Sequence, residues 1–228
     1  SGTGTELEGS FSRAPDDGGV RRSDDVRDGD RVESRRADAL SSLLRAGAVC
    51  NNAERTAEGY RGDPTEVALV VAAAKAGIEP DRRRLREVPF SSARKRMTVV
   101  VEGDGTGDRG RGSDDGSDEP TAYVKGAPEV VLDRCDRILL DGDVVPLTDE
   151  RRDAVLARNR EFAAGALRVL GFAERREVDP DADPDDLESG LTFLGLQGML
   201  DPPRSEVPGA VADCRSAGIR AVMVTGDN

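Results

Sequence analysis

A lysine near the middle of the chain stands where a protein can hold an anionic ligand. It is Lys125, in the stretch Tyr123–Glu129 (YVKGAPE), a pattern typical of a strand that ends where a helix begins. Tyr123 and Val124 favour a strand, and Pro128 suits the first turn of a helix. Helix N-termini attract anions, so the spacing predicts that Lys125 lies at a mouth formed by a sheet edge and a helix N-terminus. The alternative, a solvent-facing lysine in an ordinary turn, stays open on these residues alone.

Other side chains, far apart in the sequence, carry groups that a nucleotide needs. Phe90 could stack on a purine ring, while Lys95 and Lys125 could meet phosphate or ribose oxygens as mobile point charges. Glu66 could accept a hydrogen bond from an exocyclic amine, and Arg168 could hold a phosphate with its planar guanidinium. Each also has a structural interpretation: Phe90 as a core residue, Glu66 as a helix-capping partner, and Arg168 as a strand residue with its stem on apolar surface.

Composition restricts the class of protein. The 228 residues can form one large domain or one and a fraction, and they carry a formal net charge of -12 from 45 acidic and 33 basic residues. Only three basic residues are lysines, namely Lys75, Lys95 and Lys125. This acidic, lysine-poor balance argues against nucleic acid as a partner, because phosphate backbones need broad positive patches. It suits a protein kept soluble by self-repulsion in high salt, so we expect a halophilic source.

Two further absences exclude classes of chemistry and location. The chain has no histidine, which removes histidine acid–base catalysis, Ser-His-Asp chemistry and most zinc sites. Its three cysteines (50, 135 and 214) are far apart and are expected to be reduced thiols in a cytosolic setting. No apolar run approaches the roughly 18 residues of a membrane span, and no signal peptide is visible, so we expect these 228 residues to be soluble.

The elements that must position the candidate side chains follow from apolar spacing and turn residues. The expected helices are 37–49, 64–77, 128–135, 148–164 and 205–217. The expected strands are 97–101, 121–125, 138–140, 144–145, 167–173, 191–200 and 219–224, with a short edge strand within 1–11. The expected irregular segments are a mobile loop at 12–36, a charged connection at 80–86, a surface insertion at 103–119 and an acidic loop at 178–190.

These elements predict an α+β fold, with a mainly antiparallel sheet flanked by helices over residues 1–200. A pair of prolines, Pro202 and Pro203, marks the natural boundary. The helix and apolar strand that follow end in Thr-Gly-Asp, which is typical of a parallel α/β domain. Residues 201–228 are therefore expected to be a hinge and a fragment of such a domain.

Six motifs in order make the functional assignment sharper than any one residue does. They are GDPTE (62–66), PFSSARKRM (89–97), YVKGAPE (123–129), ALRVLGFA (166–173), GMLDPPR (198–204) and TGDN (225–228). Together they closely resemble the cytosolic loop of P-type cation-transporting ATPases, most like the calcium-pump branch. The opening residues 2–11 also resemble the strand that follows the family's phosphorylation motif. The resemblance covers nearly the whole chain outside 12–36 and 103–119.

The resemblance implies a nucleotide-binding domain with an assigned pocket. Its implied adenine platform is Phe90, with Glu66 at the adenine end. Lys95 and Lys125 are implied to line the pocket, and Arg168 to contact the phosphate end of the nucleotide. ATP is the implied ligand, with Mg²⁺ in the intact enzyme.

The carboxyl-terminal motifs imply a second, HAD-like phosphorylation domain. Asp201 and Arg204 match positions at the hinge to that domain. Thr225, Gly226 and Asp227 match its phosphate site. The implied partners in the parent protein are the phosphorylation and actuator domains and the membrane helices, which places this domain on the cytoplasmic face of a membrane.

Departures from the family pattern define what these 228 residues are expected to do. Family members often carry arginine two residues after the stacking phenylalanine, where this chain has Ser92, so a phosphate contact is either lost or supplied by Arg94. The Asp-Lys-Thr-Gly-Thr segment that takes the phosphoryl group and the Asp-rich magnesium segment do not occur. Phosphoryl transfer needs a nucleophile and a metal as well as positioning, so we expect ATP binding without turnover.

Other interpretations compete with this one. A non-catalytic interaction or regulatory module that kept the fold without nucleotide binding is the main alternative, supported by Ser92 and the long acidic loops. A phosphatase would need an aspartate nucleophile at a strand end before the inserted domain, and these 228 residues do not contain one. The GxGxxG match at 105–110 lacks the flanking strand and helix of a dinucleotide site, and the aspartates of 179–185 lack the glycine and glutamate of a calcium loop.

Overall fold

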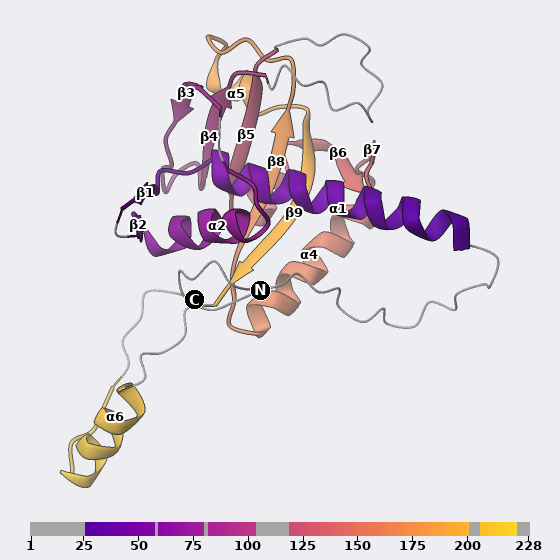
Figure 1. The fold of residues 1–228 in the computed structure, drawn as a ribbon. Helices are drawn as coiled ribbons and strands as arrows, with labels where there is room; N and C mark the ends of the chain where they lie inside the picture. Colours follow the sequence, from indigo (N-terminus) through magenta and orange to yellow (C-terminus); the bar gives the residue numbers. More distant parts are fainter. Residues whose placement is uncertain (1–25, 58, 80–81, 104–118, 201–205, 223–228) are drawn as a thin grey trace.

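A seven-stranded sheet is the frame on which the described chain is built (Figure 1). The computed structural model describes residues 26–57, 59–79, 82–103, 119–200 and 206–222, with side chains from residue 37 onward. The sheet has the order β3-β4-β5-β8-β9-β6-β7, and all neighbours are antiparallel except the parallel pair β6–β9. Its strands are β3 Arg84–Val88, β4 Arg96–Val101, β5 Thr121–Gly126, β6 Cys135–Leu140, β7 Asp143–Pro146, β8 Arg168–Arg175 and β9 Leu191–Met199. A separate hairpin joins β1 Glu54–Thr56 to β2 Gly59–Arg61.

Helices cover both faces of the sheet. They are α1 Val26–Val49, α2 Pro64–Lys75, α3 Pro128–Leu132, α4 Asp149–Ala164, α5 Pro184–Leu187 and α6 Val207–Ser216. Along β4 the side chains alternate: Met97 and Val99 pack with α1 and α2, whereas Val100 packs on the opposite face with Leu187 of α5. Val131 of α3 lies on that second face too, with Val124 of β5. Figure 1 shows α6 apart from the body of the sheet.

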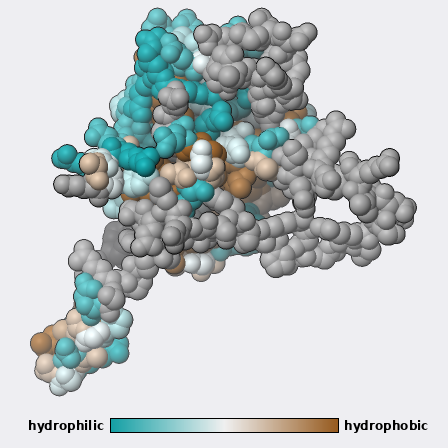
Figure 2. Space-filling view, viewed as in Figure 1, coloured by the Kyte–Doolittle hydropathy of each residue, from teal (hydrophilic) through white to brown (hydrophobic). Residues whose placement is uncertain are grey.

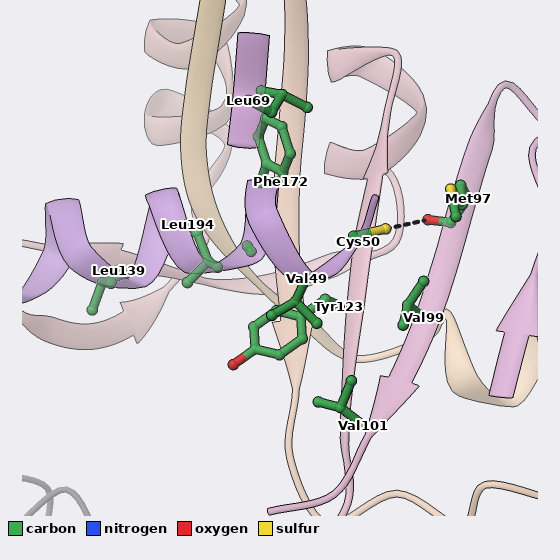
Figure 3. Close-up of a cluster of buried hydrophobic side chains, with 11 residues drawn as sticks. Val49, Cys50, Leu69, Met97, Val99, Val101, Tyr123, Leu139, Phe172 and Leu194 are labelled. Atoms are coloured by element: carbon green, nitrogen blue, oxygen red, sulfur yellow. Dashed lines mark hydrogen bonds between the residues drawn. The ribbon is translucent and has the colours of Figure 1, made fainter. Parts of the chain in front are cut away.

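The core on the α1–α2 face packs around a phenylalanine in the middle of the sheet (Figure 3). Phe172 of β8 is fully buried and belongs to one cluster with Val49 of α1, Leu69 of α2 and Tyr123 of β5. The Cys50 thiol donates to the Met97 carbonyl oxygen at 3.5 Å, which ties the end of α1 to β4. The end of α1 and the start of α2 are therefore fixed against the strands that carry the candidate site.

Two local predictions are confirmed with their mechanism. Asp63 caps α2 by accepting from the Thr65 amide at 2.9 Å, with Pro64 at the first helical position. The β6–β7 hairpin turns through Asp141 and Gly142, whose φ angles of 48° and 87° are those of a left-handed two-residue turn. The α+β fold class with a mostly antiparallel sheet flanked by helices is also confirmed.

Four segment predictions are wrong. Residues 26–36, expected in a mobile loop, form the first half of α1, because extending a nucleated helix costs little even for polar residues. The charged connection at 80–86 runs into β3, whose residues pair with β4 at the edge of the sheet. The third helix ends at Leu132 rather than near Cys135, because Cys135 pairs with Leu191 of β9. The acidic loop at 178–190 contains the short helix α5.

The region after the sheet is described in part. Helix α6 confirms the helix expected at 205–217, but residues 219–222 are not in a strand. The edge strand expected within 1–11, the GxGxxG match and the residues Asp201, Arg204, Thr225, Gly226 and Asp227 lie outside the described residues. Within the described ranges, no helix is both long and apolar enough to cross a membrane. The face shown in Figure 2 is mostly hydrophilic where it is described.

Candidate functional site

An ion pair joins the start of α2 to the end of β5. The Lys125 Nζ donates to Glu66 Oε1 at 2.6 Å, and only 8% of the Lys125 side chain and 19% of the Glu66 side chain are exposed. The alternative of a solvent-facing lysine is therefore wrong. The expected strand end is present, since Lys125 is one residue before the end of β5, but the charge is paired with Glu66 at the start of α2 and not with the helix that follows β5. Lys125 instead lies on the α1–α2 face of the sheet, with its charge held against the first turn of α2.

The two asparagines after α1 hold Glu66 in place. The Asn51 side-chain amide donates to the carbonyl oxygens of Glu66 at 2.9 Å and Gly47 at 3.0 Å. The Asn52 backbone amide donates to Glu66 Oε2 at 3.3 Å, and its side chain donates to Glu87 Oε1 at 3.0 Å. A carboxylate oxygen can accept two hydrogen bonds, and each Glu66 oxygen accepts one here, so Glu66 keeps capacity for a ligand donor.

The phosphate-end candidate lies beside the same helix start. Arg168, the first residue of β8, donates from Nη1 to Thr65 Oγ1 at 3.0 Å. Thr65 is the neighbour of Glu66 in the first turn of α2. Three of the predicted site residues (Glu66, Lys125 and Arg168) therefore meet around this helix start.

The remaining two candidates lie on the loop between β3 and β4, residues 89–95. Phe90 is 60% exposed, so its interpretation as a core residue is wrong. Lys95 is exposed at a left-handed φ of 52° and closes the loop, since its amide donates to the Ser91 carbonyl oxygen at 2.7 Å. Its own carbonyl oxygen accepts from the Ala127 amide at 3.0 Å. A Cβ on Gly126 would lie 2.4 Å from that oxygen, so only glycine permits this close approach of the loop to β5.

A buried glutamate holds the two arginines of this loop region. Glu188 is 0% exposed and accepts from Arg94 Nη2, from Arg96 Nε at 2.5 Å and from Thr98 Oγ1 at 2.6 Å. Arg94 also donates from Nη1 to the Pro89 carbonyl oxygen at 3.2 Å. The Arg94 guanidinium is therefore already bound to Glu188 and to the Pro89 carbonyl oxygen. These bonds favour the interpretation that the phosphate contact made by the family's arginine at position 92 is lost rather than supplied by Arg94.

Burial also defines the thiol beneath the site. Desolvation raises the pKa of Cys50 to about 12, opposed by the nearby Lys125 charge. At neutral pH this thiol is protonated, so it acts as a small apolar residue rather than a nucleophile. Within the ranges that the structure describes, no three histidine, cysteine or acidic side chains are grouped to hold a metal ion.

The structure thus brings all five described candidates to one end of the sheet, although in two groups. Glu66, Lys125 and Arg168 form one group, and Phe90 and Lys95 lie on the loop that is bonded to the residue after Gly126. The supporting residues were not predicted from the sequence; they are Asn51, Asn52, Arg96, Thr98 and Glu188. The paired asparagines after a helix were a usable signal for the first two, but nothing local marked Glu188 within its acidic segment.

A mostly antiparallel sheet with helices on both faces, and with an exposed aromatic ring, two lysines and an arginine at one end, has the parts of a nucleotide-binding domain. Residues 39–206 match the family described as P-type ATPase, cytoplasmic domain N. This chain belongs to that family.

Curated relatives agree with the family. The chain is 41% identical over 199 residues to a calcium-transporting ATPase of Bacillus subtilis and 37% identical over 196 residues to calcium-transporting ATPase 1 of Bacillus cereus. These alignments cover 83% and 84% of this chain but 21% of each relative. It is 33% identical over 212 residues to a sodium/potassium-transporting ATPase subunit alpha-A of Artemia franciscana, covering 82% of this chain and 20% of that relative. The chain thus spans about a fifth of the length of the relatives it matches.

Proposed function

We propose that this domain binds ATP for a P-type ATPase that couples ATP hydrolysis to cation transport. The observation that carries the proposal is the gathering of an exposed aromatic ring, Phe90, with three cationic side chains and a carboxylate at one end of the sheet. Family membership and the names of the relatives support it.

In the proposed complex the adenine stacks on Phe90, and its exocyclic amine donates to the free lone pairs of Glu66. Lys95 contacts phosphate or ribose oxygens, and Lys125 lines the wall of the pocket while it remains paired with Glu66. Arg168 reaches the phosphate end from its place beside Thr65. This domain supplies positioning and no phosphoryl acceptor, so by itself it binds ATP without turnover.

The rest of the cycle is assigned to other parts of the parent protein. The γ-phosphate passes to an aspartate of the phosphorylation domain, to which residues 201–228 lead, with Asp201 and Arg204 at the hinge and Thr225, Gly226 and Asp227 at the phosphate site. Mg²⁺ accompanies the phosphates there, as it does in other phosphoryl transfers. The actuator domain and membrane helices complete the transporter, with this domain on the cytoplasmic face. The acidic composition adds the proposal that the protein works in high salt.

The proposal can be tested by titrating the domain with ATP and monitoring the amide resonances of the 89–95 loop and of Lys125. We expect weak binding, with a dissociation constant of about 1 mM, because one stacked ring and a few charges give only about 4 kcal/mol. Phe90→Ala should weaken binding about 5- to 150-fold, the range for losing one stacked base. Leu140→Ala, an exposed apolar position on β6, is the matched control and should bind as the unaltered domain does. If ATP at several millimolar moves no resonance, the alternative of a non-catalytic module replaces this proposal.

A further inference from the structure

Glu188 is a buried carboxylate outside the set of proposed nucleotide contacts. It follows α5, and its backbone amide donates to the Pro184 carbonyl oxygen at 3.1 Å. Its side chain is fully buried and accepts from two guanidinium groups and one hydroxyl, those of Arg94, Arg96 and Thr98. A carboxylate with three such donors in a buried position is held in one orientation.

Both arginines extend from Glu188 to the backbone of the 89–95 loop. Arg94 donates from Nη1 to the Pro89 carbonyl oxygen at 3.2 Å, the peptide group that precedes Phe90. Arg96 donates from Nη1 to the Arg94 carbonyl oxygen at 3.2 Å, the peptide group that precedes Lys95. The Glu188 carboxylate is therefore linked to the peptide group before Phe90 through Arg94, and to the peptide group before Lys95 through Arg96.

This support comes from the face of the sheet opposite the Glu66–Lys125 pair. Thr98 and Met97 are consecutive in β4 and point to opposite faces; Thr98 contacts Glu188, whereas Met97 pairs with Lys125 across the strands. No hydrogen bond or ion pair of the described residues joins Glu188 directly to Glu66, Lys125 or Arg168. An effect of Glu188 on a ligand must therefore act through the loop.

We propose that Glu188 is a positioning residue for nucleotide binding, which orders the loop that presents Phe90 and Lys95. The inference rests on the proposed function. An exposed ring on an unsupported loop loses conformational freedom when a base stacks on it, whereas a loop already fixed by Arg94 and Arg96 loses less. Glu188 touches no ligand itself; it lowers the entropic cost of stacking.

A double-mutant cycle of Glu188→Gln and Phe90→Ala tests this, with ATP affinity and the amide spectrum of the ligand-free loop as readouts. Glu188→Gln removes the charge that holds both guanidiniums, so the 89–95 resonances should shift or broaden without ATP. The affinity should fall about three- to tenfold, the range for leaving one side chain unordered before binding. In the Phe90→Ala background the same substitution should cause a smaller loss, because only Lys95 then depends on the order of the loop; an equal loss in both backgrounds overturns the inference.

Glu174→Gln provides the matched control. Glu174 of β8 is also a buried carboxylate, 5% exposed, and accepts from Arg176 Nε at 3.4 Å, away from the loop. The substitution should lower the melting temperature but leave ATP affinity unchanged. If Glu174→Gln weakens binding as much as Glu188→Gln, general destabilisation explains the effect and the inference is overturned.

The outcomes separate this inference from the proposed function. If the unaltered domain does not bind ATP, the proposed function fails. If it binds, and Phe90→Ala weakens binding while Glu188→Gln does not, only the positioning role fails. Should Glu188→Gln not fold, Arg94→Lys replaces it, because one ammonium cannot reproduce the planar link from Glu188 to the Pro89 carbonyl oxygen. Arg94→Lys should then weaken binding, and an unchanged affinity overturns the inference.

Discussion

Gly126→Ala is the substitution that most directly tests how the loop and the strand are joined. A Cβ at this position would lie 2.4 Å from the Lys95 carbonyl oxygen and 2.7 Å from the Arg96 Cβ, whereas real Cβ atoms keep at least 3.0 Å. The loop must therefore move away from β5 by more than half an ångström, from 2.4 to at least 3.0 Å. That movement stretches the hydrogen bond from the Ala127 amide to the Lys95 carbonyl oxygen.

The magnitude follows from overpacking and one weakened hydrogen bond. Overpacking a fixed site costs about 1–3 kcal/mol, and the hydrogen bond adds up to about 1 kcal/mol. For a domain of this size, about 2 kcal/mol corresponds to a melting temperature lower by about 4–8 °C. Because Phe90 and Lys95 lie on the displaced loop, ATP affinity should fall as well, by about threefold or more.

Thermal unfolding and ATP titration of the same protein check both effects. Gly209→Ala in α6 is the control, because a Cβ there meets no atom within 4 Å, and both quantities should stay as they are. A Gly126→Ala domain with unaltered melting temperature and affinity would refute the reasoning that this glycine is needed for the loop to approach β5.

Three further predictions concern charge and pH. Glu66→Ala should destabilise the domain by about 3 kcal/mol, the low end for breaking a buried ion pair, because it leaves the buried Lys125 ammonium without its carboxylate. Urea unfolding checks this, and an unchanged midpoint would contradict the pairing. Burial raises the pKa of the Cys50 and Cys135 thiols to about 12 from 9.0, and that of Tyr123 to about 12 from 10.0. Above pH 9 these groups lose their protons in the unfolded chain but keep them in the folded one, so the free energy of unfolding should fall between about pH 9 and 12. A domain with both Cys50→Ala and Cys135→Ala should show a shallower fall with pH, and an equal slope would count against buried neutral thiols. Because the net charge is -12, raising KCl from about 0.1 to 1 M should raise the melting temperature by screening repulsion, and a fall would speak against self-repulsion as a destabilising term.

Local signals in the sequence predicted the elements that have their own chemical cause. Asp63 and Pro64 marked the start of α2, and Asp-Gly marked the β6–β7 turn. β3 was missed because its Arg-Leu-Arg-Glu-Val sequence resembles a charged connection, and only its pairing with β4 identifies it as a strand. Propensity cannot report a partner strand, so such edge strands are hard to predict from the sequence.

The candidate site was predictable where family motifs carried it and not where distant side chains meet. Phe90 and Lys95 were identified with their loop, but whether the phenylalanine is core or exposed depends on the tertiary fold. The pairing of Lys125 with Glu66 spans 59 residues, and that of Arg94 with Glu188 spans 94. Neither spacing has a period that a sequence pattern can show, so the supporting contacts became visible only in the structure.

The strand order has a consequence for how the chain can acquire its structure during synthesis. β8 and β9 lie in the middle of the sheet, between β5 and β6, yet they are the last strands of the sheet to leave the ribosome. β5 lacks its neighbour β8 until residue 175 has emerged, and β6 lacks its neighbour β9 until residue 199 has emerged, so each exposes unpaired backbone groups along one edge until then. The sheet of the nascent chain therefore cannot be completed before β9 has been synthesised. We expect it to form in a single late event dominated by long-range strand pairing, rather than strand by strand from the amino terminus.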